Sequence, residues 1–287
     1  MNLLDLHCHS TASDGDLPPA ELVARAAARG CRILALTDHD CTAGLAEAGQ
    51  AAETCGVHLV AGVEVSVTWH NRTIHIVGLG VDPQQPDLAL GLKSIREGRI
   101  GRAEAMAADL LRVGVEDAFA GAMRYCSNPE MISRTHFARY LIETGRAKDK
   151  DQAFKRFLVN GKPGYVRHQW AELADAVRWI RAAGGIAVIA HPGRYKIGRR
   201  LMGELIADFK AAGGEAIEVV SASHSASEIS QFGKLARAEG LLASSGSDFH
   251  APGEGGRDVG LTQPLPEGCL PVWERLGLSP ADYAETL

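Results

Sequence analysis

The sequence contains no long apolar run, no closely spaced cysteine pair and few aromatic residues. No run of about 18 apolar residues occurs in the 287, so we expect no membrane-spanning helix. The start of the chain lacks a basic segment followed by an apolar core, so we expect no secretory signal. None of the six cysteines forms a C-x-x-C pair, which argues against a zinc knuckle and fits a protein of the reducing cytoplasm.

The net charge is −5, which argues against a protein that coats nucleic acid without sequence preference. Aromatic residues make up 6% of the chain, too few for the long basic and aromatic track of a processive nuclease. Nothing in this composition implies an obligate protein partner. The hydrophobic share of 46% is typical of a globular enzyme.

Short apolar runs alternate with amphipathic stretches along most of the chain. The apolar runs predict strands over 3–8, 32–37, 57–65, 73–79, 186–190, 216–220 and 241–246. The stretches between them predict helices over 18–29, 43–55, 171–183, 199–212 and 225–239. Repeated β–α alternation with short links predicts a parallel sheet, and about seven units favour an α/β barrel over an open sheet.

Residues 86–165 interrupt this alternation. They show only helical patterns, over 86–113, 129–143 and 149–159, so we predict a barrel domain from 1–85 and 166–287 and a helical lid at 86–165. Residues 91–165 hold 14 Lys and Arg against 9 Asp and Glu, whereas the remainder holds 16 against 26. A basic lid over an acidic barrel suits an anionic substrate beside metal ions, although basic residues that merely solvate exposed helices are the alternative. For residues 264–287 the sequence predicts a coil and a short helix packed on the outside of the barrel.

Polar side chains with metal-ligand chemistry recur at or near the ends of the predicted strands. His7 and His9 follow an apolar strand and point to the same face, because side chains alternate with period two. Asp248 and His250 repeat this spacing. In parallel α/β barrels such strand ends meet on one rim, so we predict one ligand set. The candidate ligands are His7, His9, Asp14, His39, Glu64, His75, His191, Asp248 and His250.

Nine donors exceed the four to six that one ion needs, so we expect two or three divalent ions. Imidazole and carboxylate ligands without thiolate suit Mn, Zn or Fe, and Mn is the ion that we expect.

Five fragments, DLHCHS, TDHD, GVEVS, AHPG and GSDFH, resemble in this order the motifs of the PHP (polymerase and histidinol phosphatase) superfamily. The resemblance runs from residue 1 to about 265 and implies a distorted (β/α)7 barrel with a trinuclear metal centre. It implies that His7, His9 and Asp248 bind the first ion and that Glu64 bridges ions. The remaining ions would be completed by His39, His75, His191 and His250. Asp14 stands where some members have a histidine.

The stretch GKPGYV at 161–166 and the helical insertion resemble the branch of the superfamily that acts on nucleotides. Within that branch the chain most resembles phosphatases that remove the 3′-phosphate from nucleoside 3′,5′-bisphosphates. A 5′→3′ exoribonuclease acting on short 5′-phosphorylated RNA and a non-catalytic metal-binding module stay open as alternatives. A histidinol phosphate phosphatase fits the lid and GKPGYV poorly.

The expected chemistry is in-line attack on phosphorus by water that the metal ions activate. The candidates for proton transfer are Asp248, His250 and His39, each of which has plain metal ligation as its alternative. A second phosphate that is not cleaved calls for arginine, which contacts phosphate through two donors at once. The candidate substrate contacts are Arg194, Arg134, Arg99, Arg102, Asp14 and His224. For each arginine, a solvated surface position is the alternative.

Overall fold

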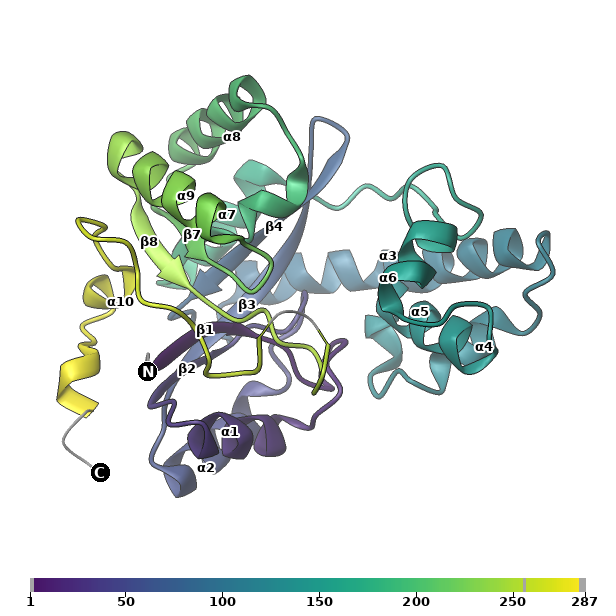
Figure 1. Cartoon of the computed structure of the whole chain (residues 1–287), viewed down its shortest axis with the longest axis horizontal. Helices are drawn as coiled ribbons and strands as arrows, with labels where there is room; N and C mark the ends of the chain where they lie inside the picture. Colours follow the sequence, from purple (N-terminus) through teal and green to yellow (C-terminus); the bar gives the residue numbers. More distant parts are fainter. Residues whose placement is uncertain (1–2, 255–256, 284–287) are drawn as a thin grey trace.

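The computed structural model describes residues 3–254 and 257–283, and it consists of a strongly curved sheet flanked by helices, with a group of helices to one side (Figure 1). The strands of the curved sheet are β1 (Leu4–Cys8), β2 (Ile33–Leu36), β3 (His58–Trp69), β4 (Arg72–Leu79), β6 (Ile186–Ile189), β7 (Ala216–Val220) and β8 (Leu242–Ser245). They are hydrogen-bonded in the order β1-β2-β3-β4-β6-β7-β8.

The two edges of this sheet meet, so the sheet is a nearly closed barrel. The segment after β8 lies parallel to the end of β1, where the His9 amide donates to the Phe249 carbonyl at 2.9 Å. One step earlier, the Asp248 amide donates to the His7 carbonyl at 2.7 Å. Residues predicted at two distant strand ends are therefore neighbours, and the predicted α/β barrel is confirmed.

The prediction that all strands are parallel is wrong at β4. This strand runs antiparallel to both β3 and β6. The link from β3 to β4 is only His70 and Asn71, whose φ angles of 43° and 61° are those of a two-residue hairpin turn. A parallel crossover needs a dozen or more residues, so such a short link forces the antiparallel direction.

An additional strand, β5 (Ala171–Glu172), pairs with β3 where we predicted the first turn of a helix. The helices around the barrel are α1 (Pro19–Ala28), α2 (Leu45–Cys55), α7 (Leu173–Ala182), α8 (Arg199–Ala211) and α9 (Ala226–Glu239). Local signals explain their ends. Proline occupies the first turn of α1, and α9 begins with a capping box of Ser225 and Glu228 and ends at Gly240, whose φ is 66°.

The chain between β4 and β5 is helical. It forms α3 (Pro86–Leu111), α4 (Ala118–Met123), the turn η1 (Pro129–Met131), α5 (Arg134–Glu143), α6 (Lys150–Ala153) and the π-helical turn η2 (Phe154–Leu158). The predicted helix at 129–143 is divided in two, because Ser133 is an extended N-cap that starts α5 in a capping box with His136. The short helix α4 was not predicted, since six residues carry too little periodic pattern.

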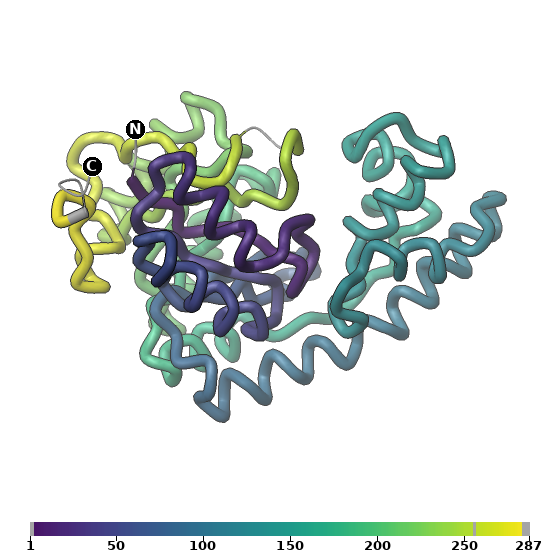
Figure 2. Tube along the Cα trace, turned by 90° about the horizontal axis from the view of Figure 1, so that it is seen from below, coloured from purple at the N-terminus to yellow at the C-terminus, as the bar shows by residue number. Residues whose placement is uncertain are grey.

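Helix α3 belongs to both parts of the molecule (Figure 2). Its first half packs on the barrel, where Leu88, Leu92 and Ile95 join the largest group of buried apolar side chains. Its second half packs with α4 and α5 in a separate apolar group that includes Met106 and Leu110. One rigid element therefore carries the other helices of this region at a fixed place beside the barrel rim.

The C-terminal part of the described chain includes α10 (Val272–Arg275), whose buried Val272 packs against the barrel. This agrees with the predicted short helix outside the barrel, although residues 284–287 lie outside the described residues. Among the described helices none has the length and apolar character needed to cross a membrane.

Candidate metal centre

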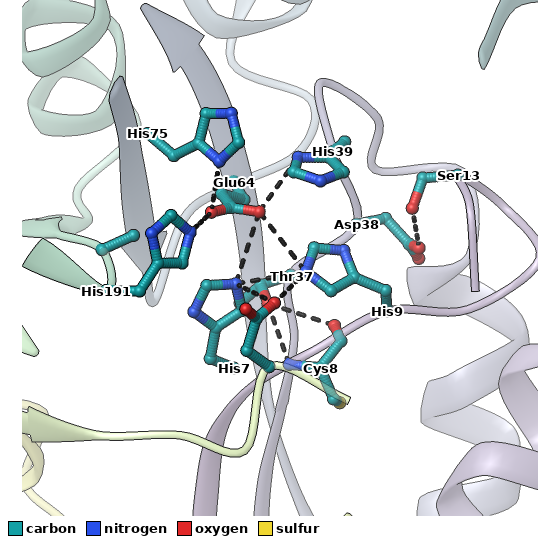
Figure 3. Close-up of polar contacts among 12 residues, drawn as sticks. His7, Cys8, His9, Ser13, Thr37, Asp38, His39, Glu64, His75 and His191 are labelled. Atoms are coloured by element: carbon teal, nitrogen blue, oxygen red, sulfur yellow. Dashed lines mark hydrogen bonds and ion pairs between the residues drawn. The ribbon is translucent and has the colours of Figure 1, made fainter. Parts of the chain in front are cut away.

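Glu64 of β3 lies at the centre of a group of imidazoles on the barrel rim. Its Oε1 lies 2.9 Å from His75 Nδ1 and 2.8 Å from His191 Nε2, while its Oε2 lies 2.9 Å from His39 Nδ1. The imidazoles that surround this carboxylate are those of His7, His9, His39, His75 and His191 (Figure 3). His75 reaches the rim from the first half of β4, which is possible only because β4 runs antiparallel to β3.

His7 and His9 lie on the other side of Glu64, at the end of β1. The Nε2 atoms of both rings lie 3.3 Å from Glu64 Oε2 and 3.1 Å from each other. Asp248, from the loop after β8, brings its Oδ1 to 3.6 Å from His7 Nε2 and 3.3 Å from His9 Nε2. Two imidazoles and two carboxylates thus aim their ligand atoms at one small volume.

A further cluster forms around Asp14, in the turn after β1. Asp14 Oδ1 lies 3.4 Å from His250 Nε2 and 3.9 Å from His39 Nε2. Its Oδ2 accepts a hydrogen bond of 3.1 Å from the Ser133 hydroxyl at the start of α5. The ring of His9 stacks on that of His250 with centroids 4.2 Å apart, which joins this cluster to the preceding one.

The donors fall into three overlapping groups whose members each offer a ligand atom within 4.8 Å of the others. The groups are His7, His9, Glu64 and Asp248; His9, Asp14, His39 and His250; and His39, Glu64 and His75. The sixth histidine that we predicted as a ligand, His191, joins them through Glu64.

Four buried carboxylate oxygens in these groups accept no hydrogen bond from any described residue: Asp14 Oδ1, Glu64 Oε2 and both Asp248 Oδ1 and Oδ2. Buried unpaired carboxylate oxygens are costly unless a cation neutralises them. The donor set is borderline to hard and lacks thiolate, so these residues fit divalent first-row ions.

The electrostatics keep Glu64, Asp248 and His9 in the protonation states that metal ligation needs. Although burial favours the neutral rings, the carboxylates that face His7 and His39 raise the pKa of His7 well above its ordinary value and that of His39 to about 9. Burial alone would raise the pKa of Glu64, but the surrounding imidazoles, His39 first, hold that pKa well below its ordinary value. For Asp248, burial would also raise the carboxyl pKa, but Arg194 together with the neighbouring imidazoles keeps that pKa well below its ordinary value. Burial, aided by the neighbouring imidazoles, lowers the pKa of His9 to about 3, so its ring is neutral.

Two buried carboxylates that we did not predict as site residues hold, by hydrogen bonds, the loops that carry the candidate ligands. Asp5 accepts the Ser247 amide at 2.8 Å and thereby holds the loop that bears Asp248. Asp38 accepts the Ser10 amide at 2.8 Å and the Ser13 hydroxyl at 2.6 Å, which fixes the turn that leads to Asp14.

Glu218 of β7 is another supporting carboxylate that we did not predict. Its Oε1 lies 2.6 Å from His7 Nδ1, and its Oε2 accepts the His191 amide at 2.5 Å. The signal that could have found it is a single acidic residue in the apolar strand AIEVV, the same signal that identified Glu64 in GVEVS.

A pocket of about 500 Å³ adjoins the rim and the helices between β4 and β5. Its rim side is lined by Asp14, His39, Glu64, His75, His191, Asp248 and His250, and its other side includes Arg99, Arg102, Arg134, Lys150 and Trp170. Carboxylate and imidazole ligands therefore line one side, and guanidinium groups line the other.

The arginines in the pocket are paired to different degrees. Arg99 is buried against the carboxylate of Asp40. No described carboxylate pairs with Arg102 or Arg134, which instead donate to the backbone carbonyls of Val166 at 3.2 Å and Leu158 at 3.4 Å. Burial lowers the pKa of Arg102, and the charges of Arg134 and Arg99 lower it further. A bound anion would relieve both effects.

The two remaining substrate candidates occupy different places. Arg194 lines the pocket and pairs with Asp248. His224 is not among the residues that line the pocket. Its Nδ1 donates to the Val219 carbonyl at 3.0 Å, and its Nε2 accepts the Gly193 amide at 3.2 Å. His224 thus supports, from behind, the loop that carries His191 and Arg194.

Comparison with known proteins agrees with this geometry. The family model described as PHP domain matches residues 5–185. A 3′,5′-nucleoside bisphosphate phosphatase from Chromobacterium violaceum is 60% identical over 282 residues, covering 97% of this chain and 99% of the relative. A 5′-3′ exoribonuclease from Haemophilus influenzae is 42% identical, covering 94% and 98%. The structure of an amidohydrolase from C. violaceum, with bound sulfate and no metal, superposes with a TM-score of 0.94 at 59% identity, covering 98% and 99%.

Proposed function

This chain belongs to the PHP domain family, and we propose that it is a metal-dependent phosphatase acting on nucleoside 3′,5′-bisphosphates. It hydrolyses the 3′-phosphate of a substrate such as adenosine 3′,5′-bisphosphate and gives a 5′-nucleotide and phosphate. The observation that carries this proposal is a single pocket with metal-ligand groups on one side and unpaired arginines on the other. A pocket of about 500 Å³ is of the size that binds small molecules.

The residues that would hold the ions are the predicted nine: His7, His9, Asp14, His39, Glu64, His75, His191, Asp248 and His250. We propose two or three divalent ions, Mn first. Such ions, when bound, activate water and neutralise the charge on the phosphoryl oxygens. Residues 86–165 act in this proposal as the lid that supplies the arginines.

Different arginines would bind the two phosphates of the substrate. Arg102 and Arg134 have no carboxylate partner among the described residues, so they are free to hold the 5′-phosphate that is not cleaved. Arg99 lines the same pocket, and its ion pair with Asp40 fastens helix α3 to the barrel. Arg194, which already contacts Asp248, faces the phosphate at the metal ligands.

Among the three candidates for proton transfer, His250 is the one whose tautomer the structure specifies. Its Nδ1 lies 3.0 Å from the Asp248 carbonyl, which can only accept, so Nδ1 carries the proton. Its Nε2 then offers a lone pair toward Asp14 and suits metal ligation. Proton transfer to the leaving alkoxide is left to His39, the other imidazole candidate, or to water.

A 5′→3′ exoribonuclease is the second candidate, because the relative from H. influenzae bears that name and aligns along nearly the whole chain. The same arginines would hold the 5′-phosphate of a short RNA.

All six cysteines, which lie within the described residues, are free thiols, and this supports our expectation of a cytoplasmic protein.

The experiment is phosphate release by Mn²⁺-loaded protein from adenosine 3′,5′-bisphosphate, AMP and a 5′-phosphorylated RNA oligomer in parallel. We expect rapid release from the bisphosphate with 5′-AMP as product, and no release from AMP. Mononucleotides from the RNA with the bisphosphate left intact would contradict the phosphatase and favour the nuclease. Loss of all activity in the Asp248→Asn protein, measured on both substrates, excludes a contaminating enzyme.

A further inference from the structure

Glu218 is the only charged residue in the strand β7, and its side chain is 1% exposed. A carboxylate buried in a barrel wall is costly unless hydrogen bonds compensate for its lost hydration. Both of its oxygens are compensated, and both donors belong to residues of the metal centre, His7 and His191. The Glu218 carboxylate therefore forms hydrogen bonds to two candidate metal ligands.

The first contact fixes the protonation of the His7 ring. Glu218 Oε1 lies 2.6 Å from His7 Nδ1, and an ionised carboxylate can only accept, so Nδ1 carries the proton. The other nitrogen, Nε2, lies 3.3 Å from Glu64 Oε2 and 3.6 Å from Asp248 Oδ1, so it is the ring atom left to bind an ion. A carboxylate behind a ligand imidazole both orients the ring and strengthens its donor nitrogen.

The second contact fixes the backbone of His191. This residue has a φ of 27°, a conformation that side-chain-bearing residues rarely adopt, and Pro192 follows it. Glu218 Oε2 accepts the His191 amide at 2.5 Å and holds the residue in that conformation, from which His191 Nε2 reaches Glu64 Oε1 at 2.8 Å. One side chain thus joins ligands from β1 and from the loop after β6.

We propose that Glu218 is a positioning residue of the metal centre, which sets the affinity for divalent ions by fixing the His7 tautomer and the His191 backbone together. The inference rests on the metal centre of the proposed function and is independent of the substrate. Metal binding can be measured without any turnover.

The test is Mn²⁺ binding to metal-free wild-type and Glu218→Gln proteins, by titration calorimetry and by metal analysis after gel filtration. Glutamine has nearly the same shape, but only one end of its amide is an acceptor. Either His7 Nδ1 or the His191 amide must therefore face a second donor. We expect affinity to fall by about 10- to 100-fold for at least one ion, the range typical of residues that support metal ligands.

Glu215→Gln is the matched control, because Glu215 lies just before the same strand and is partly exposed. We expect this variant to bind Mn²⁺ like the wild type. Glu218→Asp keeps a charged acceptor, so it should retain more affinity than Glu218→Gln while remaining below the wild type. It also supplies the comparison if Glu218→Gln does not fold.

Two results would overturn the role of Glu218: wild-type Mn²⁺ affinity in folded Glu218→Gln, or wild-type affinity in Glu218→Asp should the glutamine variant not fold. An equal loss of affinity in Glu215→Gln would overturn it as well. A wild-type protein that binds no Mn²⁺ is a different failure, since it contradicts the metal centre itself. Melting curves of the metal-free proteins show that affinity is compared between folded chains.

Discussion

At the scale of single residues, the site depends on Glu64, whose two oxygens contact imidazoles from four separate segments of the chain. The sequence was sufficient to predict this residue, because an acidic side chain inside an apolar strand needs a compensating partner. It was less informative about Asp5 and Asp38, which accept hydrogen bonds from backbone amides and serine hydroxyls of other loops, because no motif spacing indicates such contacts.

Glu64→Gln should disrupt the metal centre, because a neutral amide has only one acceptor oxygen with which to contact the surrounding imidazoles and bind cations. We expect phosphate release from adenosine 3′,5′-bisphosphate to fall by on the order of 100-fold or more, with weaker Mn²⁺ binding. Metal analysis and steady-state kinetics measure both effects. Glu53→Gln, on the exposed face of α2, is the control and should match the wild type. A fully active Glu64→Gln protein would refute this account of Glu64.

Arg102→Ala should weaken substrate binding more than it slows the reaction, because Arg102 lies on the side of the pocket away from the predicted ligands. A charge-assisted contact is worth about 1.5–3 kcal/mol, which corresponds to a roughly 10- to 100-fold higher KM for the bisphosphate. Steady-state kinetics should show a much smaller change in kcat. The control is Arg112→Ala, whose side chain is 78% exposed at the end of the same helix. Equal KM values for the two variants would contradict this role of Arg102.

At the scale of elements, the sequence predicted most strands and the barrel helices, because their periodicity and end signals are local. It did not predict the direction of β4, since parallel and antiparallel strands share the same side-chain alternation. The short link of His70 and Asn71 was the available signal. The error matters for His75, because a parallel β4 would carry this residue near the opposite end of the barrel, whereas the antiparallel hairpin places it beside Ser66 on the rim.

Gly62→Ala tests the close approach of β2 and β3 next to Glu64. A Cβ at this position would lie 2.7 Å from Thr37 Cγ2 and 2.9 Å from the Leu36 carbonyl oxygen. We expect a loss of about 1–3 kcal/mol in the free energy of unfolding, measured by urea denaturation. Gly49→Ala is its counterpart in α2, where nothing lies within 4 Å of the added methyl. It should stabilise by about 0.5–1 kcal/mol, and a destabilisation equal to that of Gly62→Ala would contradict the packing argument.

At the scale of the whole molecule, the barrel carries the candidate ligands, and the helices between β4 and β5 carry most of the arginines that line the pocket. Helix α3 connects these functions, since its first half packs on the barrel and its second half on the other helices. The charge difference between residues 91–165 and the remainder of the chain favoured basic groups facing an acidic rim, and the lining of the pocket agrees with this charge distribution. All four arginines that the sequence suggested line the pocket, but which of them lack a carboxylate partner was not predictable, because that depends on how α3 and α5 are oriented.

Removing metal should destabilise the whole fold, because the candidate ligands lie in or directly after most strands of the barrel. An ion present at 100 times its Kd stabilises the native state by about 2.7 kcal/mol, if the unfolded chain does not bind it. We therefore expect a chelator to lower Tm by several degrees in scanning calorimetry, and added Mn²⁺ to restore it. Identical Tm values with chelator and with Mn²⁺ would contradict metal binding by the folded chain.

The same pocket is expected to bind the phosphate that is hydrolysed at the metal centre and, through its arginines, a second phosphate that is not hydrolysed. The most direct test is the ratio of kcat/KM for adenosine 3′,5′-bisphosphate to kcat/KM for adenosine 3′-monophosphate. Each contact to the 5′-phosphate contributes roughly 10- to 100-fold, so we predict a ratio of about 100 or more in the wild type. In Arg134→Ala the ratio should fall by at least about tenfold, with the activity on the 3′-monophosphate nearly unchanged. A ratio near one in the wild type, or the same ratio in both proteins, would contradict the account.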